Sequence, residues 1–428
     1  MVRRLLLAAT LGLVSCTSPI RLPESSLLFP LGVASGAPAP DSIQLWTRYQ
    51  GSRGLRYEIW PQGAEGLETS SQGEVSVQPG GFAQLEVRGL APGSAYSFGF
   101  FEEGEGGSRS RVGRFRTAPA AGDSPPVRFS IFSCAKNGNP MELMERAAES
   151  TVDAALFLGD TVYADSAKDL DGYRAKWTEN LSTLGFRAVR GSTPILATWD
   201  DHEVVNNWSG TLLTSVKQSA GMQAFFDFVP MRRDPLVPQR LWHSVRFGRT
   251  AEVFVLDSRA EREPAGRETA LAQYLSAAQL QWLLDGLSAS EARFKVVMNS
   301  VPITDFPGLF DAAADDRWEG YAAQRTHLLS EIETRGIPGV IFVAGDFHLG
   351  SVGKVAPFGP GASLLEVVVG PASNFTNPLA GLLGPPQFDW ARDVNNYVLL
   401  DLDPQTGEAT VTFRDQRGMI LFQRVYSP

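Results

Sequence analysis

The first part of the chain alternates between apolar and polar residues in short runs separated by turns. Residues 42–46, 55–60, 83–87 and 96–100 each show this period of two, which places every second side chain on one buried face of a strand. Short strands at this spacing are typical of a small antiparallel sandwich. We therefore expect residues 28–118 to form an N-terminal all-β domain.

A different rhythm begins at residue 127, where apolar strand-like runs alternate with helical stretches. Residues 141–150, 271–287 and 321–335 have helical patterns and lie between such runs. Alternation of this kind predicts a buried sheet with helices on its faces, which is an α/β domain. We expect this larger domain to cover residues 127–428.

The segments that flank these two patterns have compositions of their own. Residues 90–96 and 114–117 are similar to parts of a fibronectin type III or immunoglobulin-like domain. Residues 119–126 are rich in Ala, Pro and Gly and are predicted to form a linker. Residues 396–426 return to alternation on both sides of a Pro- and Gly-containing turn, which predicts a terminal hairpin.

The first residues have the pattern of an export signal. Arg3 and Arg4 precede an apolar run at residues 5–14, too short to span a bilayer, and Ser15 and Cys16 follow it. The end of the run resembles a bacterial lipoprotein cleavage site. We expect residues 1–15 to be a signal peptide, Cys16 to be lipidated and residues 16–27 to be a tether. The protein would then be a lipoprotein facing the periplasm or the cell exterior; a plain signal peptide or a short buried helix is the alternative.

Composition narrows the classes of function. The chain has 428 residues and a formal net charge of −9, which argues against a surface built to hold nucleic acid through its phosphates. It has only two cysteines. If Cys16 is lipidated, Cys134 has no partner for an intrachain disulfide, so another role for this thiol must be sought.

Potential metal ligands follow five apolar strands of the larger domain, each at the point where the strand ends. In chain order they are Cys134, Asp160 with Tyr163, Asp201 with His202, Asn299, and Asp346 with His348. A single Asp after a strand is usually a turn residue or a helix cap. Five strand ends that all carry such residues are harder to explain as separate turns and caps. Functional sites in sheets of this type assemble at the carboxyl ends of the strands. The pattern predicts a metal site.

The types of ligand indicate which metals would bind. One subset is mixed and anionic and suits trivalent iron: Cys134, Asp160, Tyr163 and His348. The other donors, from Asp201, Asn299 and Asp346, are all oxygen atoms. Asp160 could bridge the two metals. An oxygen-only set suits Ca²⁺ or Mn²⁺ better than Zn²⁺. The chain has four histidines, too few for a His-rich pair of zinc ions.

These motifs resemble those of the PhoD-type alkaline phosphatases, which are calcineurin-like metallophosphoesterases related to purple acid phosphatases. The resemblance lies in residues 159–163 (Gly-Asp-Thr-Val-Tyr), 199–208 (beginning Trp-Asp-Asp-His-Glu) and 345–348 (Gly-Asp-Phe-His), and at residues 32–36 and 42–48 of the N-terminal part. It implies a sandwich of mixed β-sheets flanked by helices. It also implies Fe³⁺ at Cys134, Asp160, Tyr163 and His348, and Ca²⁺ at Asp160, Asp201, Asn299 and Asp346, with Mn²⁺ or Zn²⁺ as alternative metals.

The hypothesis that follows is an extracytoplasmic phosphomonoesterase or phosphodiesterase that uses a metal pair to activate water. His202 would act as a general acid or stabilise the transition state rather than bind metal. Arg259 follows the strand at residues 253–257 and would either contact the substrate phosphate or pair with Asp257.

Two other functions remain open at this stage. A surface lipoprotein with a degenerate hydrolase domain would bind a partner without catalysis, and a cysteine hydrolase would use Cys134 with a histidine. The sequence does not choose among monoesters, diesters, nucleotides, phospholipids and teichoic-acid-like polymers. Among partners, it predicts a phosphate ester substrate, contact with the membrane only through the lipid anchor, and no nucleic-acid-binding surface.

Overall fold

The computed structural model describes residues 22–65, 68–210 and 215–428. The predicted signal peptide, Cys16 and the first part of the tether lie outside these residues. Within them, no helix has both the length and the apolar composition that a membrane crossing requires.

The N-terminal part is a sandwich of seven strands. The strands are β1 (Val33–Gly36), β2 (Ser42–Arg48), β3 (Leu55–Pro61), β4 (Ser71–Val75), β5 (Phe82–Arg88), β6 (Ala95–Glu102) and β7 (Gly113–Arg116). A sheet of order β4-β3-β6-β7 packs on the group β1-β2-β5. Val33, Leu45, Ile59, Phe98 and Phe115 fill the space between them. The predicted all-β domain is confirmed.

The larger domain contains thirteen strands and six α-helices among the described residues. Its strands are β8 (Val127–Phe132), β9 (Ala154–Leu158), β10 (Pro194–Thr198), β11 (His243–Phe247), β12 (Ala251–Val255), β13 (Phe294–Met298), β14 (Val340–Ala344), β15 (Gly350–Lys354), β16 (Leu365–Val368), β17 (Phe388–Arg392), β18 (Tyr397–Asp403), β19 (Glu408–Arg414) and β20 (Ile420–Tyr426). Its helices are α1 (Glu142–Ala147), α2 (Leu170–Leu181), α3 (Leu184–Arg190), α4 (Ser215–Phe228), α5 (Ala277–Ala289) and α6 (Ala322–Thr334), with short 3₁₀ helices η2 (Pro264–Gly266), η3 (Gly308–Asp316), η4 (Trp318–Tyr321) and η5 (Pro378–Leu382).

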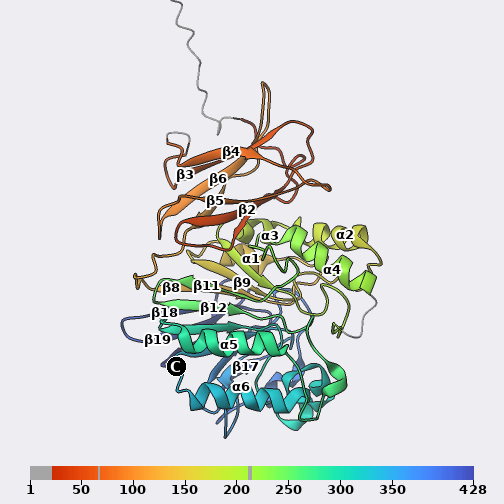
Figure 1. Ribbon diagram of the computed structural model, residues 1–428, viewed down its shortest axis with the longest axis vertical. Coiled ribbons are helices and arrows are strands. Elements are labelled where there is room, and N and C mark those ends of the chain that lie inside the picture. The colour runs from red at the N-terminus through yellow and green to blue at the C-terminus, as the bar shows by residue number, and fades with distance from the viewer. Residues whose placement is uncertain (1–21, 66–67, 211–214) are drawn as a thin grey trace, which may run out of the picture.

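These strands form two sheets that pack face to face. One has the order β20-β19-β18-β8-β9-β10-β1-β2-β5 and the other β11-β12-β13-β14-β16-β15-β17. Successive residues of the second sheet alternate between two cores: Val253 and Val296 pack in the core shared with β8 and β9, whereas Phe254 and Val297 pack under α5 and α6. Strands buried on both faces explain the continuous apolar runs of the sequence. The predicted sandwich of mixed sheets flanked by helices is confirmed (Figure 1).

The two domains share a sheet, which the sequence did not predict. Strand β1 pairs in parallel with β10 of the larger domain, so the nine-stranded sheet runs from the C-terminal strands into the N-terminal sandwich. Gly36 permits this junction, since a Cβ atom there would lie 2.0 Å from the carbonyl oxygen of Pro230. The linker at residues 119–126 therefore joins two units that also share backbone hydrogen bonds.

Two element predictions differ in detail from the structure. The predicted terminal hairpin is a three-stranded meander, in which β18 also pairs with β8. The helix predicted from residue 271 begins only after Ser276, whose hydroxyl oxygen accepts a hydrogen bond from the Gln279 N–H at 3.2 Å. A serine cap of this kind fixes where a helix begins, and the apolar residues before it belong to a loop.

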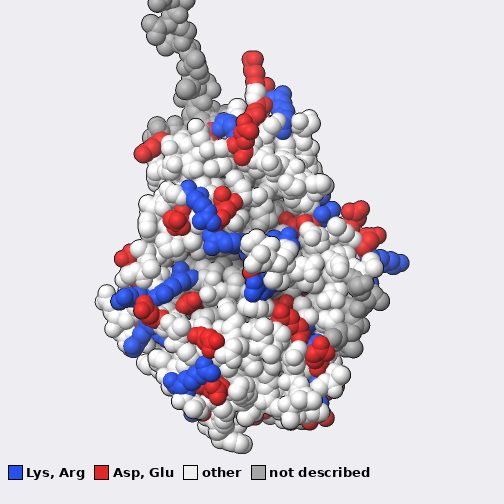
Figure 2. Space-filling model, in the orientation of Figure 1, with Lys and Arg blue, Asp and Glu red and all other residues white. Residues whose placement is uncertain are grey.

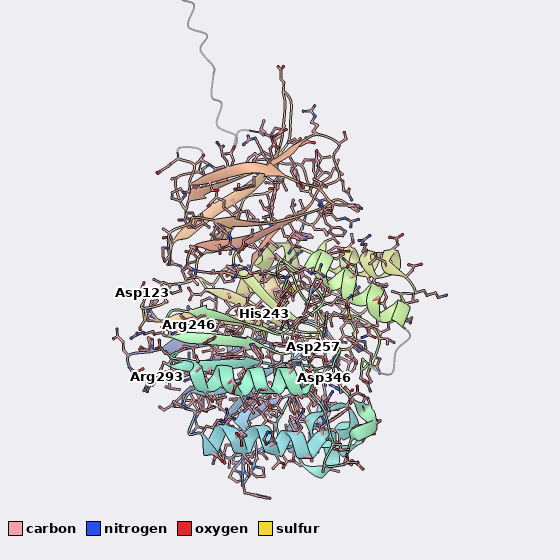
Figure 3. The ribbon with its side chains drawn as sticks, viewed as in Figure 1. Asp123, His243, Arg246, Asp257, Arg293 and Asp346 are labelled. Carbon is pink, nitrogen blue, oxygen red and sulfur yellow. The ribbon has the colours of Figure 1, made fainter. Side chains whose placement is uncertain are left out.

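Strand direction brings the predicted ligands together. Strands β8, β9 and β10 are parallel, and so are β12, β13, β14 and β16. Figure 3 shows the consequence for the second sheet: Asp257 and Asp346 lie beyond the carboxyl ends of their strands, whereas Arg293, which precedes β13, lies at the opposite end. The described ligand candidates thus meet at one edge of the two sheets.

We predict that Trp46→Ala destabilises both domains together. The buried Trp46 indole donates to the Asp227 carbonyl at 2.8 Å, and the Arg190 guanidinium lies over its ring at 4.3 Å. Loss of this side chain should lower the free energy of unfolding by about 3–5 kcal/mol in one cooperative transition, measured by urea denaturation. Leu236→Ala, at a site 89% exposed, is the control with an expected change within about 0.5 kcal/mol. A separate early transition of the sandwich, with the larger domain unaffected, would contradict the prediction.

Candidate metal centre

Four of the predicted ligands have backbone conformations that L-residues rarely adopt. The φ angles are 54° at Cys134, 54° at Asp160, 60° at Asp346 and 55° at His348. Left-handed conformations at residues other than glycine cost free energy and tend to occur where function requires them. Each of these residues follows the end of a strand, and the donor atoms of all four belong to clusters that could hold a metal ion.

The glycines of the two Gly-Asp pairs allow neighbouring loops to touch. A Cβ atom at Gly159 would lie 2.5 Å from the Cβ atom of Asp200, and one at Gly345 would lie 2.0 Å from the Ser133 hydroxyl oxygen. Both distances are shorter than real side chains permit, so only glycine fits. The two glycines therefore hold the loops after β8, β9, β10 and β14 close enough for a shared site.

The side chains form overlapping clusters. Donor atoms within each cluster lie within 4.8 Å of one another, and the clusters are Cys134 with Asp160 and His348, Asp160 with Asp201 and His202, and Asp200 with Asp201 and Asp346. The Tyr163 hydroxyl joins the first of them, 2.8 Å from Asp160 Oδ2 and 3.3 Å from His348 Nε2. Asp160 belongs to two clusters, as a bridging ligand would.

Asn299 contributes a buried acceptor that lacks a partner. Its amide nitrogen donates to the Val301 carbonyl, but its Oδ1 atom accepts no hydrogen bond from the described residues. Oδ2 of the buried Asp200 is also unpaired within the described part of the chain. A buried polar atom without a partner is costly, and a cation is the kind of group that satisfies such oxygens.

The electrostatics of the metal-free site also favour cations. Burial and then neighbouring carboxylates raise the pKa of Asp160 and of Asp346, and burial and Asp160 raise the pKa of the Cys134 thiol. Burial lowers the pKa of His348 to about 4 and keeps its imidazole neutral, the form that binds metals. A set of crowded acids, a thiol and a neutral imidazole fits a metal centre, because bound cations stabilise the deprotonated ligands.

Arg259 pairs with two carboxylates at the site. Its side chain is completely buried, and it donates to Asp200 at 2.6 Å and to Asp316 at 2.7 Å. Its pairing with Asp257 is limited to a backbone N–H bond of 3.1 Å. The guanidinium thus compensates the buried charge of Asp200, the pairing with Asp257 is made by the backbone alone, and a contact of Arg259 with the substrate phosphate stays a prediction.

Glu203 was not singled out from the sequence, yet it links two ligand-bearing loops. Its carboxylate accepts from the backbone N–H groups of Asp200 at 2.9 Å, Asp160 at 3.1 Å and Thr161 at 2.6 Å. The side chain is fully buried. It thus fixes the loop after β9 against the loop after β10, and the only sequence signal is its place in the Asp-Asp-His-Glu motif.

Asp165 is a second residue that sequence reasoning missed. Its carboxylate lies 2.8 Å and 2.9 Å from His202 Nδ1, and it accepts from the Asn206 N–H at 2.7 Å. Burial lowers the pKa of His202, but the bond to Asp165 and the charge of Asp201 outweigh it and raise the pKa to about 9. In the sequence, the one indication of a role for Asp165 is its position two residues after the proposed ligand Tyr163.

An open pocket of about 360 Å³ gives access to these groups. The lining residues are Asp160, Asp201, His202, Asn206, Asn207, Asp316, Arg317, Asp346, Phe347, His348, Phe375, Thr376, Asn377 and Pro378. The pocket therefore exposes His202 and carboxylates of both proposed metal sites to a ligand from solvent.

We predict that Glu203→Gln lowers stability and metal retention together. The amide keeps the shape of the side chain, but its NH₂ group faces N–H donors, which should cost about 2 kcal/mol in the free energy of unfolding. Urea denaturation and metal content after dialysis measure the two effects. Glu149→Gln, on the exposed surface, is the matched control. Wild-type stability and metal content in Glu203→Gln would contradict the role of this carboxylate.

Comparisons with known proteins identify the family. The model of the PhoD-like phosphatase family matches residues 129–382, and the model of its N-terminal domain matches residues 15–119. Alkaline phosphatase D of Bacillus subtilis (strain 168) is 26% identical over 383 residues, which are 76% of this chain and 65% of the relative.

Solved structures show the same fold. A structure of PhoD has a TM-score of 0.82 and 23% identity and covers 94% of this chain and 89% of its own. Purple acid phosphatase PPD1 from yellow lupin (Lupinus luteus) seeds has a TM-score of 0.68 and 13% identity over 92% of this chain and 73% of its own. On the strength of the family model that covers residues 129–382, the chain belongs to the PhoD-like phosphatase family.

Proposed function

We propose that the protein is an extracytoplasmic, metal-dependent phosphate ester hydrolase with a two-metal site. The observation that carries the proposal is a set of overlapping clusters of donor side chains from four strand ends: Cys134, Asp160, Asp201, Asp346 and His348, with the Tyr163 hydroxyl bonded to Asp160. Four of these residues, Asp160, Asp201, Asp346 and His348, line one pocket. Asn299 Oδ1, after a fifth strand, and Asp200 Oδ2 are buried oxygens that have no hydrogen-bond partner in the described residues. All seven proposed ligands are present, which favours catalysis over a degenerate binding domain.

The two sites differ in the ligands that they offer. Fe³⁺ would be held by Cys134, Asp160, Tyr163 and His348, whose three anionic donors (thiolate, carboxylate and phenolate) with one imidazole form a mixed set that suits a trivalent iron. Ca²⁺, or Mn²⁺ in its place, would be held by oxygen donors alone: Asp160, Asp201, Asn299 and Asp346.

The fully buried thiol does not suit the alternative of a cysteine hydrolase. Cys134 has no exposed surface, and burial followed by the charge of Asp160 raises its pKa. A nucleophilic cysteine needs a lowered pKa and access to substrate. Cys134 meets neither requirement, and this favours a ligand role for its thiol.

A metal pair polarises phosphoryl oxygens and lowers the pKa of a coordinated water. Around it, the protein orients the ester and supplies a proton. His202 lines the pocket, and because Asp165 occupies its Nδ1 atom, Nε2 is the nitrogen left to face the substrate. A protonated Nε2 gives its proton to the departing alkoxide, and the stacked Tyr163 ring, 4.2 Å away between centroids, holds the imidazole plane.

The proposal includes a location for the enzyme outside the cytoplasm. A signal peptide at residues 1–15 and lipid on Cys16 would hold the enzyme at a membrane outside the cytoplasm, through residues 16–27. The ester it hydrolyses there, monoester or diester, would reach the site through the open pocket.

Elemental analysis and a visible absorption spectrum of protein purified without chelators test the metal assignment. We expect iron and calcium, with a charge-transfer band that Tyr163→Phe weakens or shifts, because phenolate coordinates the iron. Tyr57→Phe is the control, since this tyrosine lies in the N-terminal sandwich. Zinc or manganese without the band would overturn the iron assignment, and the absence of stoichiometric metal after reconstitution would overturn the catalytic proposal.

The proton-donor role of His202 predicts a dependence on the leaving group. Asp165→Asn should reduce kcat about 100-fold for alkyl phosphates, whose alkoxide needs a proton, and much less for p-nitrophenyl phosphate, whose leaving group departs unprotonated. His202→Ala should show the same selectivity, and Asp171→Asn, at an exposed position of α2, should show no loss. Equal losses for both substrates would contradict this role.

A further inference from the structure

The loop at residues 373–378 is unusual because it is anchored on both sides and yet exposes a phenylalanine. The Asn374 amide donates to the Tyr163 hydroxyl at 2.6 Å, and the Asn377 N–H donates to the His348 carbonyl at 2.7 Å. Between these anchors, Phe375 is 69% exposed. The ring is therefore not the tip of a free loop, since residues on both sides of it are hydrogen-bonded to two of the proposed iron ligands, Tyr163 and His348.

A third anchor fixes the start of the same loop. The Ser373 carbonyl accepts from the Lys136 N–H at 3.0 Å and from the Asn139 amide at 3.1 Å, and the Ser373 N–H donates to the Cys134 carbonyl at 3.3 Å. The Phe375 N–H also donates to the Asn374 side-chain oxygen at 2.9 Å. Such a framework limits the entropy that Phe375 loses when a ligand covers it.

Phe375 lies at the mouth of the metal pocket. Its ring packs edge-on against the His348 imidazole, with 4.3 Å between centroids, and Phe347 and Pro378 line the pocket beside it. The exposed Leu379 and Leu382 of η5 continue this apolar surface away from the metals. Asp160 and Asp201, in contrast, line the polar part of the same pocket.

We propose that Phe375 is a specificity-determining residue that receives the hydrophobic organic group of the phosphate ester. The inference rests on the proposed function: a phosphate held at the metals leaves its ester group inside a pocket whose one wall is Phe347, Phe375 and Pro378. Burying a large exposed apolar ring against such a group is favourable. A polyol packed on the Phe375 ring would lose hydrogen bonds with water that the ring cannot replace, although Thr376 and Asn377 also line the pocket. The substrate class that Phe375 favours is therefore an ester of phosphate with an alkyl or aryl alcohol.

A series of n-alkyl phosphates from methyl to octyl tests the proposal, because the basicity of the leaving alcohol changes little along it. We expect kcat/KM to rise roughly twofold per added CH₂ in the wild type, since an alkyl group that packs against one wall of an open pocket buries about half of its surface. Phe375→Ala should make this rise shallower and reduce kcat/KM about tenfold for octyl phosphate, with little effect on methyl phosphate. Phe375→Leu should restore most of the rise. A parallel pair, phenyl and naphthyl phosphate, shows whether aryl groups gain in the same way.

Phe358→Ala is the matched control, because Phe358 is 80% exposed and does not line the pocket. Binding of n-alkyl phosphonates to the metal-loaded protein, measured by calorimetry, tests contact with Phe375 without turnover. Affinity should rise with chain length as steeply in Phe358→Ala as in the wild type, and less steeply in Phe375→Ala. Affinities and rates independent of chain length, or the same rise in Phe375→Ala as in the wild type, would overturn the proposal. Absence of turnover for every phosphate would instead overturn the proposed function, while the phosphonate titration would still decide the role of Phe375.

Discussion

Mutual repulsion of acidic groups at the edge of two sheets is the constraint on which the rest of the structure depends. Asp160, Asp200, Asp201 and Glu203 are all buried there, and Asp346 lies against them. Charges of one sign at such spacing are tolerated only where each has a compensating partner. Arg259 compensates Asp200, and three backbone N–H groups hold Glu203. Asp160 accepts from the Tyr163 hydroxyl and the His202 N–H, but among the described residues no ion pair joins Asp160 or Asp346 to a cationic side chain. A bound cation would compensate both carboxylates.

The surrounding fold holds these acidic groups in place, although the site itself is unfavourable in free energy. Parallel strands deliver the ligands to one edge, Gly159 and Gly345 let the loops approach, and four of the ligand candidates have left-handed backbones. Left-handed residues and crowded acids both cost free energy, so the surrounding sheets must supply it. The nine-stranded sheet does so across both domains, since β1 extends the sheet that carries Cys134, Asp160 and Asp201. The N-terminal sandwich is thus part of the support of the site. On the face shown in Figure 2, acidic and basic side chains are interspersed, and exposed pairs of this kind add little to that support.

The sequence predicted the features that depend on chain-local patterns. Period-two alternation indicated the sandwich, and parallel strands, which place their carboxyl ends together, indicated that the ligand candidates at the strand ends would lie close to one another. Features that depend on contacts between distant segments were not accessible in this way. The burial of Arg259 behind Asp200, the three bonds of Glu203 and the pairing of β1 with β10 join residues far apart in the chain. Asp165 and Phe375 were missed for another reason: an Asp in a turn and a Phe in a loop are common, and only their places beside His202 and His348 give them a role.

Anomalous diffraction from crystals of the purified protein, recorded above and below the iron edge, would show directly whether metals bind at these side chains. We predict two bound metals. One, with an iron signal, would lie among Cys134, Asp160, Tyr163 and His348, and the second, lighter ion would lie among Asp160, Asp201, Asn299 and Asp346. Electron density that shows these side chains around water alone, in protein reconstituted with both metals, would contradict it.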